Sequence, residues 1–331
     1  MSTDRHDTPP RSSTRRRVIK GVVVGVGGLL GAGVLGVGGV LLHDRNLRFA
    51  RGAVRVIPDH RVALPAAAPR MVIARGPDPA RNVRAAVERL GGMSQFVGPA
   101  DVVVIKPNIG WDRAAALGAN THPDVVSEVV RRVRGANPRR GNVSDCPVRR
   151  SRAALERSGI LVAASAAGAE VIAPEDSRYH PVYVSRRLGT WDVLEPFVIA
   201  TKVINVPVAK HHPLTGVTCG LKNWFGITGR LRMTLHADVQ RSIAEFAALM
   251  RPTLTIVDAS RVLMEHGPEG RSLDDVKPVR TVAAGTDPVA LDAWATSLFP
   301  GPPPANLALA AQLGLGRLDW QALAPVELVT G

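Results

Sequence analysis

The run DVVVIKP at residues 101–107 and the run THPDVVSEVVRRVRG at residues 121–135 together indicate the class of fold. The first run is continuously apolar between breaking residues, which is typical of a buried strand. The second carries Pro123 in its first turn and places apolar side chains at helical spacing, at Val125, Val126, Val129, Val130 and Val133. A buried strand followed by an amphipathic helix is the repeating unit of a parallel sheet.

The same alternation continues along the chain. Strands are expected at 71–75, 101–107, 141–145, 169–174, 198–208, 253–259 and 279–285, and helices at 80–92, 121–135, 151–158, 238–250 and 288–298. Strands separated by crossover helices predict an α/β fold with a mainly parallel, doubly wound sheet and flanking helices. We expect one α/β domain over residues 71–331, and a division into two lobes near 180–195 stays open.

Composition limits the classes of partner. The chain has 331 residues, 45% of them apolar, and a formal net charge of +14 at pH 7. Only 4% of residues are aromatic and no basic run is interleaved with aromatic residues, so no nucleic acid partner is expected. Anionic lipid headgroups or a small anion fit the charge better, and an unspecialised basic surface explains it equally well.

The N-terminal segment has the pattern of an export signal. Residues 14–20, TRRRVIK, match the twin-arginine pattern, and the uncharged run GVVVGVGGLLGAGVLGVGGVLL follows at 21–42. As a helix that run is about 33 Å long, enough to cross a bilayer core. No clean cleavage site follows, so an uncleaved anchor is favoured over a removed signal. We expect a cytoplasmic tail (1–20), a signal or transmembrane helix (21–42), a linker (43–70) and an extracytoplasmic body.

Polar residues follow the carboxyl ends of five expected strands. They are Lys106 with Asn108, Asp145, the group at 210–212, Asp258 and Asp287. In open α/β sheets the ligand crevice lies at this edge, so these side chains are expected to converge. Single members have simpler explanations, because an Asp before Pro288 is a common helix N-cap and Asp258 can cap a turn. The set as a whole predicts a site.

The segment KHHPLTGVTCGLKNWFGITG (210–229) is the centre of this set. The chain has only six lysines among its 42 basic residues, and four of them are Lys106, Lys202, Lys210 and Lys222, in or beside the strand-end motifs. Lysine can act as an amine nucleophile or base, whereas arginine stays charged. Gly226 lets the backbone approach a ligand, and Thr218 and Asn223 add hydrogen-bonding groups. We predict a loop that binds a small anionic or carbonyl ligand.

The histidines leave two interpretations open. His122, His212 and His236, with Asp145 and Asp258, have the side chains of a His/carboxylate metal site, although no local metal motif joins them. Equally, the histidines can transfer protons or contact an anion. The identity of any cofactor stays unknown. Cys146 and Cys219 are the only cysteines, so this chain alone cannot ligate an iron–sulfur cluster, and they are either free thiols or one disulfide.

These motifs resemble the domain of unknown function 362 family over roughly residues 70 to 320. The resemblance is carried by VVIKPNIGWDR (103–113), NTHPDVV (120–126), NVSDCP (142–147), VINVPVAKHHPLTGVTCGLKNWFGITG (203–229), LH (235–236), IVDASRVLMEHGPEG (256–270) and AAGTDPVALDAW (283–294). Matched position by position, it singles out Lys106, Asn108, His122, Pro123, Asp145, Asn205, Lys210, His212, Thr218, Lys222, Asn223, Gly226, His236, Asp258, Gly267, Pro268, Asp287 and Asp292.

The resemblance also implies partners. The family is linked with iron–sulfur proteins, and some members carry ferredoxin-type cysteine runs, so an external redox or iron–sulfur partner is implied. This chain departs from the pattern because it has no such run. It also has Val208 where a first lysine is frequent and His211 where threonine is usual.

Two functions remain open. In the first, the chain is an exported, membrane-tethered, cofactor- or metal-dependent enzyme, with a redox subtype implied by the resemblance. Its catalytic candidates are Lys210, His212, Lys222 and His122, and its ligand-holding candidates are Lys106, Asn108, Thr218, Asn223 and Gly226. In the second, it is a non-catalytic envelope subunit that binds a ligand or assembles with redox partners. The enzyme hypothesis predicts a closed pocket in which lysine or histidine pKa values are strongly perturbed. The subunit hypothesis predicts a shallow, open groove.

Overall fold

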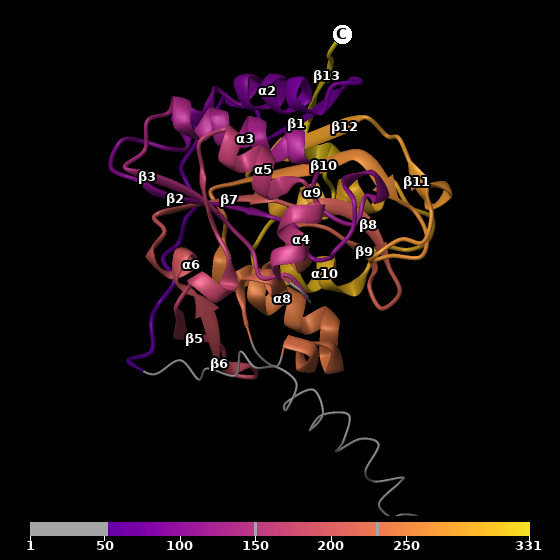
Figure 1. Ribbon diagram of the computed structural model, residues 1–331. Helices are drawn as coiled ribbons and strands as arrows, with labels where there is room; N and C mark the ends of the chain where they lie inside the picture. Colours follow the sequence, from indigo (N-terminus) through magenta and orange to yellow (C-terminus); the bar gives the residue numbers. More distant parts are fainter. Residues whose placement is uncertain (1–51, 149–150, 230–231) are drawn as a thin grey trace, which may run out of the picture. The chain divides into compact units, whose positions relative to one another are not determined.

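A computed structural model describes residues 52–148, 151–229 and 232–331, which form an α/β body (Figure 1). The expected cytoplasmic tail (1–20), the apolar helix (21–42) and the first residues of the expected linker lie outside this range. None of the helices within it has the length and apolar character needed to cross a membrane.

The described residues contain a large mixed sheet with the strand order β13-β1-β12-β10-β7-β2-β3-β4. Its strands are β1 (Met71–Arg75), β2 (Val102–Pro107), β3 (Arg140–Ser144), β4 (Glu170–Ile172), β7 (Lys202–Val206), β10 (Leu254–Leu263), β12 (Thr281–Gly285) and β13 (Val326–Val329). Strands β8 (Val208–His212), β9 (Gly216–Thr218) and β11 (Val276–Lys277) extend it beside β10. Along the main order, only β12 runs against its neighbours.

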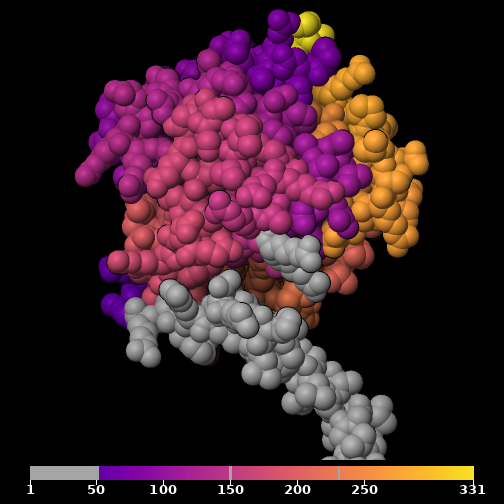
Figure 2. All heavy atoms as spheres, viewed as in Figure 1, coloured from indigo at the N-terminus to yellow at the C-terminus, as the bar shows by residue number. Residues whose placement is uncertain are grey.

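Helices cover both faces of this sheet. The described helices are α2 (Pro79–Arg89), α3 (Pro123–Gly135), α4 (Ser151–Arg157), α5 (Ile160–Ala166), α6 (Glu195–Ile199), α7 (Gly220–Asn223), α8 (Val239–Met250), α9 (Pro288–Thr296) and α10 (Ala305–Gln312). Figure 1 shows α2, α3 and α5 on one side of the sheet and α8 and α10 on the other. In the space-filling view the magenta segments that follow β2 cover most of the visible face (Figure 2).

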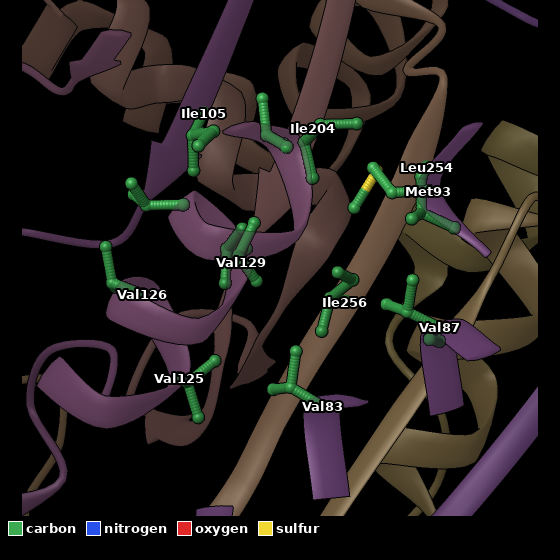
Figure 3. Close-up of a cluster of buried hydrophobic side chains, with 14 of the residues drawn as sticks. Val83, Val87, Met93, Ile105, Val125, Val126, Val129, Ile204, Leu254 and Ile256 are labelled. Carbon is green, nitrogen blue, oxygen red and sulfur yellow. The ribbon is translucent and has the colours of Figure 1, made fainter. Parts of the chain in front are cut away.

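The alternation of side chains along β2 builds both cores. Val103 and Ile105 face the helices α2 and α3, whereas Val104 joins the core beneath α8. Figure 3 shows the first of these clusters, in which α2 and α3 place their valines against the sheet, with Val83, Val87, Val125, Val126 and Val129 opposite Ile105, Ile204, Leu254 and Ile256. Each fully buried valine contributes about 1.5–3 kcal/mol of transfer free energy. Lys106 follows next on the Val104 side of the strand.

The structure confirms the α/β class and the mostly parallel sheet. It adds one correction to the expected strand at 198–208, because residues up to Ile199 belong to α6 and Pro207 separates β7 from β8. The sequence analysis also missed the antiparallel hairpin β5 (Tyr179–Ser185) and β6 (Gly189–Leu194), which lies where a break between lobes stayed open.

Candidate functional site

A cavity of about 280 Å³ opens at the carboxyl ends of β2, β3 and β8. The chain runs from β2 to β3 and β4 on one side, and then returns to place β7 on the other side of β2. Such a reversal of strand order leaves a crevice between the two central strands. The cavity is lined by Asn108, Gly110, Trp111, Asp145, Cys146, Val148, Lys210, His212, Leu214, Thr218, Lys222, Asn223, Phe225, Gly226, Arg232, Met233, His236 and Pro268.

Lys106 supports the cavity from below. Its buried ammonium donates to Asp145 Oδ1 at 2.6 Å, to the Pro107 carbonyl at 2.9 Å and to Asn223 Oδ1 at 3.1 Å. All three of its N–H groups therefore have acceptors. Burial lowers the pKa of Lys106, and the Asp145 carboxylate opposes that shift. Asp145 Oδ2 also accepts from the Ile109 backbone N–H at 2.5 Å, so Asp145 joins the loop after β3 to β2 and to the loop that follows it.

A chain of side-chain amides connects Lys106 with Lys210. Asn223 Oδ1 already accepts from Lys106, and it also accepts from Asn108 Nδ2 at 2.9 Å. The Asn223 amide group donates to Asn205 Oδ1 at 2.8 Å, which fixes its orientation. Asn108 must consequently turn its Oδ1 the other way, where it accepts from Lys210 Nζ at 2.9 Å. The second acceptor of Lys210 is the Ala119 carbonyl.

The described lining has an excess of positive charge. It carries Lys210, Lys222 and Arg232 but only one carboxylate, Asp145, which already pairs with Lys106. Burial and the neighbouring Lys222 lower the pKa of Lys210 to about 7. Burial and Arg232 lower the pKa of Lys222 to about 8. An anion bound beside Lys222 and Arg232 would relieve this repulsion.

Two histidines form one wall of the cavity. The rings of His212 and His236 lie nearly parallel, with centroids 6.4 Å apart. Burial and Lys222 lower the pKa of His212 to about 3, and they lower the pKa of His236 as well. Both rings are therefore neutral at pH 7. His212 Nδ1 accepts from the Leu214 backbone N–H at 3.2 Å, which holds Nδ1 unprotonated and leaves the proton on Nε2.

Two buried polar atoms at the cavity lack a partner among the described residues. They are Thr218 Oγ1 and His236 Nδ1. Thr218 is only 5% exposed, and it lies in β9 opposite Lys210 in the antiparallel pair β8–β9. An unsatisfied buried hydroxyl costs about 1–3 kcal/mol. A ligand that accepts from or donates to this hydroxyl would recover that free energy.

The remaining lining is apolar. Phe225 lies below Lys222, whose Nζ is 5.1 Å from the ring centroid. Leu214 and Met233 at the mouth are each 57% exposed. The cavity therefore has cationic side chains in one part and aromatic and aliphatic side chains in another. Such a lining suits a ligand that has both an anionic group and an apolar body.

Gly226 makes room for the ion pair under the cavity. A Cβ atom at this position would overlap Asp145 Oδ1 and would lie 2.7 Å from Lys106 Nζ. The lack of a side chain, rather than an unusual backbone conformation, is the reason for glycine here. The predicted approach of a ligand to the backbone at Gly226 stays a prediction, because the groups that the missing side chain accommodates belong to the protein.

His122 and Asp258 lie outside the cavity lining, in a neighbouring hydrogen-bond network. His122 is the N-cap of α3, and its Nδ1 accepts from the Asp124 backbone N–H at 3.1 Å. The His122 backbone N–H donates to Asp258 Oδ2 at 2.7 Å, and Arg261 donates to the same oxygen at 2.9 Å. Asp258 Oδ1 accepts from Ser260. These contacts hold the loop that follows β2 against β10.

The five candidate metal ligands do not assemble into one ligand set. In the part of the chain that the structure describes, one group of three or more such side chains has its ligand atoms within 4.8 Å, and it consists of Glu265, His266 and Asp275. Asp275 there accepts from His266 at 2.7 Å and from the backbone of Arg271 and Ser272, as a loop cap. Asp145 and Asp258 pair with Lys106 and Arg261, and Nδ1 of His122 and of His212 accepts from a backbone N–H.

The cysteines are both free thiols. Cys146 lines the cavity, and burial raises its pKa. Cys219 is buried behind β9. The alternative of one disulfide between them is therefore not realised.

Sequence reasoning missed Arg232 and the apolar residues of the cavity. Arg232 lies in a 3₁₀ helix (Arg232–Asp238), and its guanidinium donates to the carbonyls of Cys146 and Pro147. Trp111, Phe225 and Met233 supply much of the apolar wall. Trp111 and Phe225 lie within the motifs that carry the family resemblance. An aromatic residue beside a polar strand-end motif was therefore a sequence signal that could have placed them in the cavity.

The comparisons with known proteins place this site in a family. The chain belongs to the family described as a domain of unknown function, DUF362, whose match covers residues 103–297 and so includes the three cations of the cavity. The chain is 30% identical over 265 residues to the thylakoid-associated protein sll1697 of Synechocystis sp., and the match covers 75% of this chain and 80% of that protein. No solved structure gives a significant match.

Proposed function

We propose that the chain is an exported, membrane-tethered protein whose cavity binds a small organic anion. Export and tethering rest on the twin-arginine pattern and the apolar run at 21–42. The name of the thylakoid-associated relative agrees with a place at a membrane. The binding function rests on the cavity itself.

The excess of cations over free carboxylates is the observation that carries the binding function. Lys222 and Arg232, together with Lys210, whose pKa is lowered to about 7, share a cavity of about 280 Å³ whose one carboxylate pairs with Lys106. Keeping like charges together in a buried place costs free energy, and a bound anion offsets that cost. The unsatisfied Thr218 hydroxyl adds a polar contact. The apolar wall beside these groups favours an organic anion over an inorganic one.

The same features favour an enzyme over a shallow-groove subunit. The enzyme hypothesis predicts strongly perturbed lysine or histidine pKa values, and the lowered pKa values of Lys210, Lys222 and His212 at the cavity support it. A redox partner remains part of the proposal only through the family resemblance. The anion site does not depend on a metal, because its charge comes from side chains.

Calorimetry with 3-phenyllactate tests the binding function, because this ligand joins a carboxylate to an aromatic body. We expect binding to the wild-type protein, and an affinity lower by about tenfold to a hundredfold in Lys222→Met, as for the loss of a hydrogen bond to a charged group. Lys277→Met is the matched control, because Lys277 is exposed and lies outside the cavity.

A second ligand series makes the test decisive. Phenylphosphonate and benzenesulfonate present the same aromatic body on other anionic groups. If none of the three ligands binds the wild-type protein, or if Lys277→Met weakens binding as much as Lys222→Met, the cavity is not an anion site and the proposal is wrong.

A further inference from the structure

The two most deeply buried lysines of the site have opposite surroundings. Lys106 is 0% exposed and Lys210 is 2% exposed, and the amide pair Asn223 and Asn108 connects them. Lys106 has three acceptors, one of which is a carboxylate at 2.6 Å. Lys210 has two acceptors, and both are neutral oxygens. A buried ammonium needs a counter-ion, and only Lys106 has one.

The hydrogen bonds of Lys210 match a neutral amine. A neutral amine has two N–H groups and one lone pair, and its two N–H groups are taken by Asn108 Oδ1 and the Ala119 carbonyl. The lone pair is then the one unused position on Nζ, and Lys210 lines the cavity. The nearby Lys222 ammonium favours this neutral state, as a second cation does for nucleophilic lysines in general.

We propose that Lys210 forms an imine with the carbonyl group of a bound oxo acid. This inference rests on the proposed anion site and names the class of ligand. The carboxylate of the oxo acid is held by the cations Lys222 and Arg232, and its carbonyl carbon meets Lys210 Nζ. The apolar wall formed by Trp111 and Phe225 receives the organic part.

The reaction needs no further reagent. The Nζ lone pair attacks the carbonyl carbon, a C–N bond forms, and the carbonyl oxygen becomes a hydroxyl group by taking up a proton. A second proton then allows that oxygen to leave as water while the C=N bond forms. The amine loses two N–H protons over the two steps, and the released water carries two protons, so the balance closes. The sum is that an amine and a ketone or aldehyde give an imine and water.

The surrounding groups suit each step. The Lys222 ammonium lies in the same lining and is a proton donor to the departing oxygen. After dehydration, a protonated imine retains one N–H group, for which Asn108 Oδ1 and the Ala119 carbonyl are the available acceptors. Lys106 cannot take this role, because all its N–H groups are engaged and it does not line the cavity.

Reductive trapping tests the inference on the wild-type protein. The protein is incubated with phenylpyruvate or glyoxylate and cyanoborohydride, which reduces an imine to a stable amine, and the adduct is located by peptide mass mapping. We expect modification at Lys210 in preference to the exposed Lys277. In Lys210→Arg the adduct at position 210 is lost, whereas Lys277→Arg leaves it in place. 3-Phenyllactate, which has no carbonyl group, should compete with phenylpyruvate without forming an adduct.

The outcomes separate this inference from the proposed function. Adduct spread over exposed lysines with Lys210 unmodified, while 3-phenyllactate still binds, overturns the imine and leaves the anion site standing. Failure of both trapping and 3-phenyllactate binding overturns both. Selective adduct at Lys210 that 3-phenyllactate suppresses supports the imine and the anion site together.

Discussion

Lysine and arginine have different tasks in this chain. Lys106, Lys210 and Lys222 meet at the site, and lysine, unlike arginine, is a compact ammonium that can lose its proton. Lys202 was expected beside them, but it lies at the start of β7 and its Nζ is 4.0 Å from Asp101. Three of the four lysines therefore lie at the cavity or beneath it, and their functional roles stay predictions. Lys202 lies elsewhere, because nearness to a strand in the sequence does not say which end of the strand carries the residue.

The lowered pKa values of Lys210 and Lys222 predict an unusual pH dependence. Their values near 7 and 8 in the folded protein lie below the ordinary 10.5, so above pH 7 the unfolded chain binds more protons. The free energy of unfolding therefore rises as pH increases through this window, by at most about 1.4 kcal/mol per pH unit for each lysine. Urea denaturation of the ligand-free protein at pH 6.5, 7.5 and 8.5 measures this change in the free energy of unfolding.

The matched variant isolates the lysine contribution from that of other groups. Lys210→Met with Lys222→Met removes both titrations, so its stability should rise less between pH 6.5 and 8.5, and it should exceed wild type most at the acidic end. Equal slopes in the two proteins would contradict lowered lysine pKa values.

Thr218 offers a test of ligand contact without loss of fold. Because Thr218 Oγ1 has no partner among the described residues, Thr218→Val should leave the melting temperature unchanged or slightly higher. It should weaken 3-phenyllactate binding by about two- to tenfold, the value of one hydrogen bond. Thr215→Val is the control. Thr215 Oγ1 donates to the Val217 carbonyl at 3.0 Å and lies outside the lining, so that variant should lose stability and keep its affinity.

At the scale of elements, His122 has a structural role, because it caps the start of α3. His122 accepts from the first turn of the helix as an N-cap, and asparagine fills that role at least as well. His122→Asn should therefore keep the free energy of unfolding within about 0.5 kcal/mol, and His122→Ala should lose about 1 kcal/mol. Both variants should bind 3-phenyllactate like wild type, as measured by urea denaturation and calorimetry. A large loss of affinity in His122→Asn would place this histidine in the site after all.

The short 3₁₀ helix Trp224–Ile227, which follows α7, contains Gly226. In Gly226→Ala the new Cβ would overlap Asp145 and crowd Lys106, so the buried ion pair must shift. Overpacking of this kind costs about 1–3 kcal/mol, and the moved pair should also weaken anion binding. Gly135→Ala at the end of α3 is the control, because no atom lies within 4 Å of its added Cβ. Thermal unfolding and calorimetry on the two variants decide whether Gly226 is needed.

The spacing of apolar residues predicted the helices and strands whose buried residues follow a regular pattern. It missed the elements in which polar residues or proline interrupt that pattern. The strand at 71–75 and the helix at 288–298 were recoverable because their apolar residues are local and regular. The hairpin β5–β6 was not, since Pro181 and several polar side chains interrupt its alternation. Likewise, Arg232 is held at the cavity by the carbonyls of Cys146 and Pro147, which are 86 and 85 residues away in the sequence. Such non-local contacts leave no spacing signal.

At the scale of the whole molecule, topology does more for the site than any single motif. Strand β2 lies between β3 and β7, so the loops after it and after its neighbours face one crevice. The residues that follow β2 and β3 and those at the end of β8 therefore line one cavity. Asp287, which was expected with them, follows the antiparallel strand β12 and caps α9, because the sequence did not show the direction of that strand. The direction of each side chain was not predictable either, and His122 and Asp258 point into a neighbouring hydrogen-bond network.

The proposed place of the molecule in the cell is tested on residues outside the described body. If the pattern at 14–20 is a twin-arginine signal, Arg15→Lys with Arg16→Lys should hold the protein in the cytoplasm of a bacterium that has this export route, because the receptor reads the arginine pair. Wild-type protein should stay with the membrane after carbonate washing and should be cut by protease added outside the cytoplasmic membrane. Arg5→Lys with Arg11→Lys, which keeps the pair, should behave like wild type. Export of the Arg15/Arg16 variant at the wild-type level would refute the signal, and release of wild type by carbonate would refute the anchor. Neither result would touch the cavity, whose cations all lie in the folded body.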